Sequence, residues 1–479
     1  MQVRNWGALG WLGLAVAGCG GELPPVSPEG EGSRQVTAQA CPAGVASRVK
    51  AINSALYEPT DVQGTLYFTT GAPGGGTLLW RSDGTEAGTV QVRVFPTGIY
   101  ATGDSVAVGN TLYFQLSELG VPTEQLWISD GTSGGTRFLR SFPRDSLGGS
   151  LLSSFTALGS QLVFFHQPVG MAPELWRSDG TSAGTVGVAQ LPGVIGLDQG
   201  QTLRVGNALL FFRSQGGSTT LWRTDGTSAG TRALEQVDAG AVSLKEVSAA
   251  GSPGLFVFQD GPNHEVWRTD GTAGGTFRMD AFGRPVQLLG TLGSFVYVAS
   301  TEPTTNRLRI DRLSLGGGGK TLITTLPPNP AGLLPEVRQK TVSGGSLYFS
   351  VGLRDTGGVL QEVSLWTSNG TAAGTRQLSR TLPVDPYSDS PVFATGGGVV
   401  LFHSESNSVS TPWFTRGTVA TTGQLSGVRV LGIPNAGREP FVRSGNRVFF
   451  SAIEENAVAQ LWSAPVSFTC PPGLSETRE

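Results

Sequence analysis

The 479-residue sequence predicts an all-β fold built from a repeated unit, and three observations lead to this prediction. Gly and Pro contribute 70 and 29 residues, and charged residues make up only 14% of the chain. Both features disfavour helices and are typical of a chain with many tight turns. A hydrophobic fraction of 38%, including 23 Phe and 10 Trp, indicates a packed core. The third observation is a motif that recurs through most of the chain.

The motif reads Leu-Trp-Arg-Ser-Asp-Gly-Thr, and Gly-Thr follows it after two further residues. The clear copies contain Trp80, Trp127, Trp176, Trp222, Trp267 and Trp366, and their turns contain Asp83, Asp130, Asp179, Asp225, Asp270 and Asn369. Degenerate copies lie near Ile310, at Trp413 and at Trp462. Each of the nine copies follows a strand-like aromatic segment, so two independent features give the same count. The period is about 48 residues.

Each unit predicts four short strands, and four strands in 40 to 50 residues are typical of a β-propeller blade. A lone blade would expose two apolar faces, which only neighbouring blades can cover. We therefore expect a single propeller of eight or nine four-stranded blades over residues 41–470, with a tail at 471–479. Residues 47–53 resemble the outer strand of a unit, so the last blade should combine both chain ends. If the chain instead formed two smaller rings, the break would fall in the irregular stretch 299–345.

The repeated residues favour structural roles. Eight of the ten Trp occupy the same motif position, which indicates packing between blades; a stack of ligand-binding aromatics is the alternative. The Asp of each turn can accept hydrogen bonds from backbone N–H groups two residues on. Asn369 can make the same bond without a charge, which favours a turn over a calcium site. We expect no bound metal and no cofactor.

The motif resembles a known family. Residues 174–181 read ELWRSDGT, which matches the ELWxxDGT repeat found in bacterial proteins that are often lipoproteins. The resemblance covers about residues 45–465. It implies a propeller-like architecture, and it implies no particular activity.

The N-terminal residues predict where in the cell the protein is located. Residues 1–18 resemble a signal peptide, and Val16-Ala17-Gly18-Cys19 resembles the lipobox at which bacterial lipoproteins are cleaved and lipidated. Cys19 would then carry the lipid, and residues 19–40 would form a flexible tether. Gly20 in place of Asp resembles the sorting signal for the outer membrane. An ordinary signal peptide with a chance Cys is the alternative.

Two further cysteines bracket the repeats. Cys41 and Cys470 would meet where a ring closes, and an exported protein reaches an oxidising compartment. We expect a disulfide between them, and two free thiols are the alternative.

No motif predicts a reaction. The chain has three His, at positions 166, 264 and 403, and we expect them on exposed loops. Residues 316–321 read GGGGKT, but the first Gly of a phosphate-binding loop is replaced by Ser314. Since 33 Lys and Arg face 36 Asp and Glu, the net charge of −3 excludes electrostatic capture of nucleic acid or anionic lipid as the main role.

The segments between the aromatic strand and the Trp strand of each unit vary most, and they should all emerge on one face. The longest, residues 350–363, contains Arg354, Asp355 and Glu362 and is a candidate contact region; a tolerated surface insertion is the alternative.

Three functions remain open. The first is a monomeric, lipid-anchored module that binds or scaffolds envelope or extracellular proteins or glycans. The second is a glycan hydrolase or lyase on a propeller, and the third is a periplasm-facing scaffold for outer-membrane assembly. Fold alone does not separate them.

Overall fold

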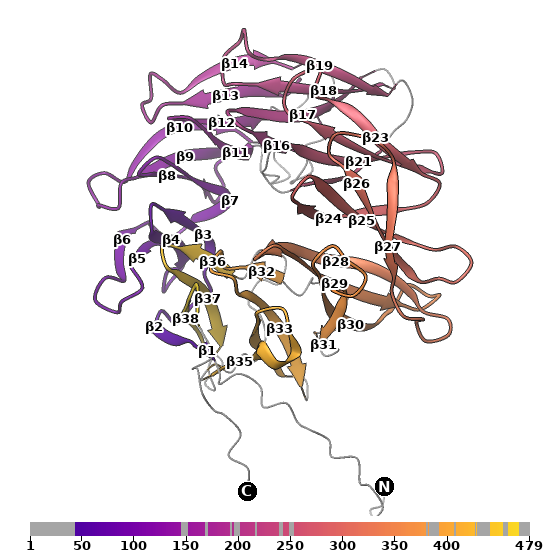
Figure 1. Ribbon diagram of the computed structural model, residues 1–479. Coiled ribbons are helices and arrows are strands. Elements are labelled where there is room, and N and C mark those ends of the chain that lie inside the picture. The colour runs from indigo at the N-terminus through magenta and orange to yellow at the C-terminus, as the bar shows by residue number, and fades with distance from the viewer. Residues whose placement is uncertain are drawn as a thin grey trace, which may run out of the picture. The chain divides into compact units, whose positions relative to one another are not determined.

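The computed structural model describes residues 44–144, 152–167, 171–191, 194–195, 202–215, 218–238, 243–248, 253–379, 382, 392–406, 409–426, 428, 441–453 and 458–468. These residues form nine sheets, antiparallel except for one short parallel pairing in blade 8, and the sheets are the blades of one β-propeller (Figure 1). They contain no α-helix and one short 3-10 turn, η1 (Val419–Thr421). The predicted all-β propeller is therefore confirmed, with nine blades.

The blades are numbered along the chain, each from its inner to its outer strand. Blade 1 contains β3 (Tyr57–Val62), β4 (Thr65–Gly71), β5 (Thr77–Ser82) and β6 (Val90–Val94). Blade 2 contains β7 (Ile99–Val108), β8 (Thr111–Glu118), β9 (Thr123–Ser129) and β10 (Arg137–Pro143). Blade 3 contains β11 (Leu152–Leu158), β12 (Gln161–His166), β13 (Glu174–Ser178) and β14 (Val186–Gln190).

Blade 4 contains β17 (Ala208–Gln215), which pairs with both β15 (Val194–Ile195) and β16 (Thr202–Val205), then β18 (Ser218–Thr224) and β19 (Arg232–Asp238). Blade 5 contains β20 (Ser243–Val247), β21 (Gly254–Asp260), β22 (Asn263–Thr269) and β23 (Phe277–Phe282). Blade 6 contains β24 (Val286–Leu292), β25 (Phe295–Thr301), β26 (Leu308–Ser314) and β27 (Lys320–Thr325).

Blade 7 contains β28 (Leu334–Ser343), β29 (Ser346–Arg354), β30 (Leu360–Ser368) and β31 (Arg376–Ser379). Blade 8 contains β32 (Val392–Ala394), β33 (Val400–Ser406), β34 (Val409–Thr415) and β35 (Thr422–Ser426), and β1 (Gly44–Val45) pairs parallel with β35. Blade 9 contains β36 (Phe441–Ser444), β37 (Arg447–Ile453), β38 (Ala459–Pro465) and β2 (Ser47–Lys50).

The ring closes through blade 9, as the sequence predicts. β2 from the start of the propeller forms the outer strand beside β38, with Arg48 opposite Trp462. On the inner side, Ser444 of blade 9 donates a hydrogen bond of 2.6 Å to the carboxylate of Asp61 in blade 1. Segments from the two ends of the chain therefore hold the ring shut.

The core lies between the blades. Nine buried apolar clusters each join one blade to the next. Adjacent residues of a strand point to opposite faces, so the motif Leu and Trp serve different interfaces. Leu126 of blade 2 is buried in the cluster with blade 3, and Trp176 of blade 3 packs against the same cluster. Trp80 is buried, whereas the other seven motif Trp are half-buried at the outer part of these interfaces.

The Asp-Gly-Thr turns are closed by their own side chains. In blade 2, Asp130 accepts hydrogen bonds from the backbone N–H of Thr132 at 2.9 Å and from its hydroxyl at 2.8 Å. These bonds lower the pKa of Asp130. A Cβ on Gly135 would lie 2.0 Å from the Asp130 carboxylate, which explains why Gly occupies that position. The same bonds form at Asp83, Asp179, Asp225, Asp270 and Asn369.

All blades are threaded from the inside outwards, which gives the propeller two distinct faces. Because successive strands are antiparallel, the Asp-Gly-Thr turns lie on one face, called here the motif face. The turns between second and third strands and the linkers between blades lie on the other, called here the linker face. This arrangement places the variable segments together, as expected.

Candidate functional site

Blade 6 departs from the repeat where the other blades carry Trp. In blade 2, Phe114 lies opposite Trp127; the equivalent residue of blade 6, Val298, lies opposite Asp311. Asp311 is fully buried and forms two 2.7 Å hydrogen bonds with the Arg309 guanidinium. An ion pair thus replaces a large ring at the degenerate copy that the sequence placed near Ile310.

A cleft of about 350 Å³ lies between blades 6 and 7 on the linker-face side. One wall is the linker 326–330, which contains three prolines. Asn329 fixes the linker by donating a 2.6 Å hydrogen bond to the carbonyl of Asn306. The backbone N–H of Leu326 donates a hydrogen bond to the carbonyl of Leu308, and the guanidinium of Arg307 donates to the carbonyl of Leu326 at 2.7 Å. The stretch that could have separated two rings is therefore one side of a pocket.

Blade 7 supplies the other wall. Val351 and Leu353 of β29 are buried at the cleft, and Glu362, Ser364 and Trp366 follow at alternate positions along β30. Alternate residues of a strand share a face, so these three side chains lie side by side. Among the described residues that line the cleft, Glu362 is the one ionisable group.

The carboxylate of Glu362 differs from those in the other blades. In blades 3 and 5 the residue two positions before the Trp is a Glu that accepts the indole N–H: Glu174 does so at 2.9 Å and Glu265 at 3.0 Å. In blade 7 this bond goes instead to the hydroxyl of Ser364, also at 3.0 Å. Glu362 lies two residues before Ser364 and is half-buried. It forms no hydrogen bond or ion pair within the described part of the chain. Its carboxylate is therefore accessible to a ligand that enters the cleft.

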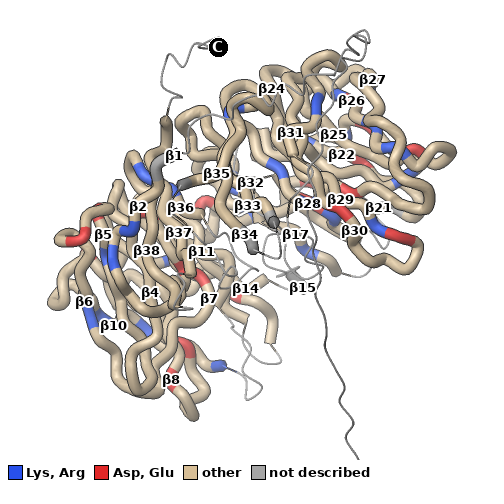
Figure 2. Tube along the Cα trace, turned by 90° about the horizontal axis from the view of Figure 1, so that it is seen from below, with Lys and Arg blue, Asp and Glu red and all other residues tan. Residues whose placement is uncertain are grey.

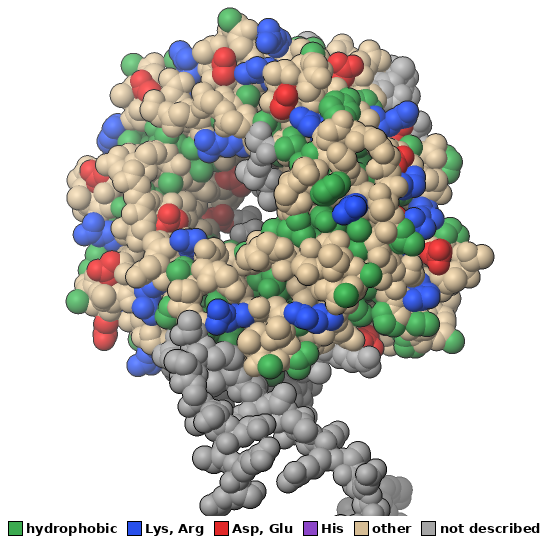
Figure 3. All heavy atoms as spheres, viewed as in Figure 1, with side chains coloured by type: hydrophobic (Ala, Val, Ile, Leu, Met, Phe, Trp, Pro, Cys, Tyr) green, Lys and Arg blue, Asp and Glu red, His purple; other side chains and the backbone are tan. Residues whose placement is uncertain are grey.

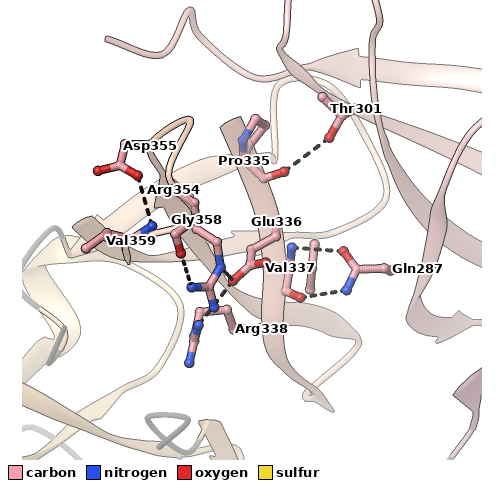
Figure 4. Close-up of polar contacts among 10 residues, drawn as sticks. All are labelled: Gln287, Thr301, Pro335, Glu336, Val337, Arg338, Arg354, Asp355, Gly358 and Val359. Atoms are coloured by element: carbon pink, nitrogen blue, oxygen red, sulfur yellow. Dashed lines mark hydrogen bonds and ion pairs between the residues drawn. The ribbon is translucent and has the colours of Figure 1, made fainter. Parts of the chain in front are cut away.

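Arg354 points to a different set of partners (Figure 4). Its guanidinium donates to the carboxylate of Glu336 at 2.7 Å and to the carbonyl of Gly358 at 2.9 Å. Arg338 donates to the same Glu336 oxygen at 3.1 Å. The positive charge of Arg354 is therefore engaged beside the cleft.

Asp355 closes the turn that follows β29. Its carboxylate accepts from the backbone N–H groups of Gly357 and Val359, both at 2.9 Å, and from the amide of Gln361 at 2.8 Å. The bond from Val359 is the main cause of a lowered Asp355 pKa. The expected loop 350–363 is in fact mostly the strands β29 and β30, since the hairpin is longer than in other blades and only 355–359 turn. Of the three candidates, Glu362 alone faces the cleft.

Polar contacts fix blade 6 against blade 7 (Figure 4). The amide of Gln287 donates to the carbonyl of Val337 at 2.7 Å and accepts from its N–H at 3.0 Å, as a neighbouring strand would. Thr301 donates to the carbonyl of Pro335 at 3.1 Å. These contacts join the inner parts of the two blades, so the outer cleft has a preformed shape.

The ring is open at its centre in the view of Figure 3. A cavity of about 510 Å³ along its wall is lined by residues that include Asp61, Arg204 and Arg443. Elsewhere on the inner strands, Lys340 of blade 7 forms an ion pair with Glu246 of blade 5, and burial lowers the pKa of Lys340 to about 8. In the view of Figure 2, both Lys or Arg and Asp or Glu are spread along the described part of the ring.

The expectation of exposed histidines is wrong. His166, His264 and His403 are all buried, because each points into the packing between blades. His166 contacts the Glu174 carboxylate at 3.2 Å, and burial lowers the pKa of His403 to about 4. The sequence places these histidines in loops, but the positions they occupy are still packed inside the core.

Some candidates fall beyond the structural description. Cys19, Cys41 and Cys470 lie outside the described residues, so lipidation and the disulfide stay predictions. Among the residues that are described, no group of three or more His, Cys, Asp and Glu could hold a metal ion. The described part of the chain also has no helix long and apolar enough to cross a membrane.

No protein-family model and no curated protein matches the chain. Solved structures that are similar include a prolyl endopeptidase, with 11% identity and a TM-score of 0.42. The match covers 81% of this chain and 56% of the endopeptidase chain. Oligopeptidase B from Leishmania major has the same identity and TM-score, with 53% of it covered by 87% of this chain. An oligogalacturonate lyase in complex with manganese has 11% identity and a TM-score of 0.41, with 99% of it covered by 77% of this chain.

Proposed function

We propose that this protein is a lipid-anchored binding module of the bacterial cell envelope, and that its partner, a protein or glycan, enters the cleft between blades 6 and 7. The observation that carries the proposal is the cleft itself, which forms where the repeat is broken. Its volume is in the range of ligand pockets, and its lining combines apolar residues with the polar side chains of Asn329, Glu362, Ser364 and Gln377. A rigid scaffold that carries an irregular, preformed concavity is typical of a binding module.

The groups at the cleft support binding. Glu362 is the single ionisable side chain among the described residues that line it. The hydroxyl of Ser364 donates to the carbonyl of Val351 at 3.3 Å and accepts from the Trp366 indole. Ser364 therefore has a structural partner on each side, and Glu362 stands alone as a recognition group.

The proposed location at the outer membrane rests on the sequence. A lipid on Cys19 and the tether 19–40 would hold the propeller at the outer membrane, with no further membrane contact required. In cell fractionation, the wild-type protein should sediment with membranes and the Cys19→Ala variant should not. Equal distribution of the two proteins would remove the anchor from the proposal and leave the cleft untouched.

Binding at the cleft is tested by photo-crosslinking in the native cells. A photoreactive amino acid replaces Pro328, an exposed residue of the cleft wall, and in a matched control it replaces Ser133, which is exposed in an Asp-Gly-Thr turn on the motif face. We expect one discrete crosslinked species from position 328 and none of that size from position 133. The same products from both positions, or none from either, would contradict the proposal.

A further inference from the structure

We infer that the cleft between blades 6 and 7 receives a cationic side chain, Lys or Arg, presented by a protein partner. This inference rests on the proposed function, and it names the chemistry of the ligand. The observation behind it is the combination of one unshared carboxylate with an aromatic and proline-rich wall.

The charge of the cleft is negative because the nearby cations are occupied. Arg354 is held by Glu336 and by the Gly358 carbonyl. Arg307 donates to the carbonyls of Leu326 and Thr325, behind the linker wall. Neither forms an ion pair with Glu362, so this carboxylate has no cationic partner among the described residues, and an incoming ammonium or guanidinium would supply one.

The walls fit the stem of such a side chain. Pro327, Pro328 and Pro330 offer apolar surface without backbone N–H groups, and Leu353 adds to it. The indole N–H of Trp366 is already donated to Ser364, so the ring offers apolar and π surface to a ligand. The methylene stem of Lys or Arg packs on apolar surface while its charge reaches an anion, and aromatic rings attract cations.

The surroundings of the cleft favour a protein over a free amine. Leu334, paired with Arg354 across β28 and β29, is 42% exposed, and Val359 in the neighbouring turn is 54% exposed. Exposed large apolar residues beside a pocket are typical of a protein contact surface. A small amine would leave both uncovered.

The test uses the full-length protein in detergent and measures binding of defined probes by calorimetry or by ligand-observed NMR. The probes are a capped Leu-Lys-Leu peptide, the same peptide acetylated on Nζ, and butylammonium. We expect the Lys peptide to bind at least tenfold more tightly than the acetylated peptide and than butylammonium. Equal binding of both peptides would overturn the cationic ligand, and equal binding of butylammonium would overturn the protein partner.

Variants locate the effect. Glu362→Gln keeps the shape of the side chain and should weaken binding of the Lys peptide about tenfold, whereas Glu86→Gln, an exposed carboxylate on the motif face, should leave it unchanged. Glu362→Asp keeps the charge and should retain most of the binding. Unfolding midpoints equal to the wild type show that each variant is folded, and unchanged binding by folded Glu362→Gln overturns the inference.

The two proposals fail differently. If Glu362→Gln leaves both peptide binding and the crosslink from position Pro328 unchanged, the cleft binds a partner but not through a cation. If position 328 gives no specific crosslink in the wild-type chain, the proposed function fails together with the inference.

Discussion

Removal of Arg309 should destabilise the propeller strongly, because it would leave a buried charge alone. Asp311 has no exposed side-chain surface, and both its oxygens are held by Arg309 at 2.7 Å. Arg309 itself is 24% exposed, so it can be removed without opening a large cavity. Breaking a buried ion pair on one side costs about 3–5 kcal/mol. Arg309→Ala should therefore lower the free energy of unfolding by about that amount.

The assay is thermal and urea unfolding of the full-length protein, followed by circular dichroism. With an unfolding entropy of about 2 cal/mol/K per residue, the midpoint should fall by roughly 3–5 °C for a propeller of this length. Arg309→Ala with Asp311→Leu removes both charges and should recover most of the loss. Arg278→Ala breaks an ion pair whose Arg is 55% exposed and should cost less than about 1 kcal/mol. If Arg309→Ala costs no more than Arg278→Ala, the reasoning about blade 6 is refuted.

Three further changes test the architecture. Gly135→Ala forces the Asp130 carboxylate away from its place in the turn and should destabilise the fold by about 1–2 kcal/mol. In the same unfolding assay the control Gly134→Ala, with no atom within 4 Å of the added Cβ, should be neutral or slightly stabilising. Trp222→Ala should cost about 2–4 kcal/mol, less than a fully buried ring, and a change below about 1 kcal/mol would show that this Trp packs little between blades. Cys41→Ser should lower the thermal midpoint to that of the reduced wild type, and a wild-type midpoint that ignores reductant would show that Cys41 and Cys470 are not bridged.

The fold could be predicted because its information is local and repeated. The motif Leu and Trp alternate faces in every clear copy, and the Asp-Gly-Thr turn is closed by bonds within four residues. Signals of this kind can be detected in a single sequence because every repeat shows them again. The sequence contains nine units, but it predicts eight or nine blades because nine exceeds the four to eight blades that are typical of propellers.

The candidate site was less accessible from sequence. The sequence points to Glu362 together with Arg354 and Asp355 in a segment that it predicts as a loop, but whether Glu362 or Arg354 faces a pocket depends on strand register. The sequence predicts that the fold could break in the stretch 299–345, which includes the linker 326–330, and no local signal shows that this linker forms a wall of a cleft. One signal is present in the sequence: Glu362 lies four residues before Trp366, on the same face of β30, while Ser364 occupies the position two residues before the Trp and accepts its indole N–H.

The measurement that tests the central claim most directly is labelling of the cleft in cells. Pro328→Cys and Ser133→Cys proteins are treated with a small maleimide, once in cells with an opened outer membrane and once after purification, and labelling is compared with the unsubstituted chain. If the cleft holds a partner, position 328 should react more slowly in cells than in the purified protein, while position 133 should react equally in both. Equal rates at position 328 would show that the cleft is empty in the cell and would contradict the account.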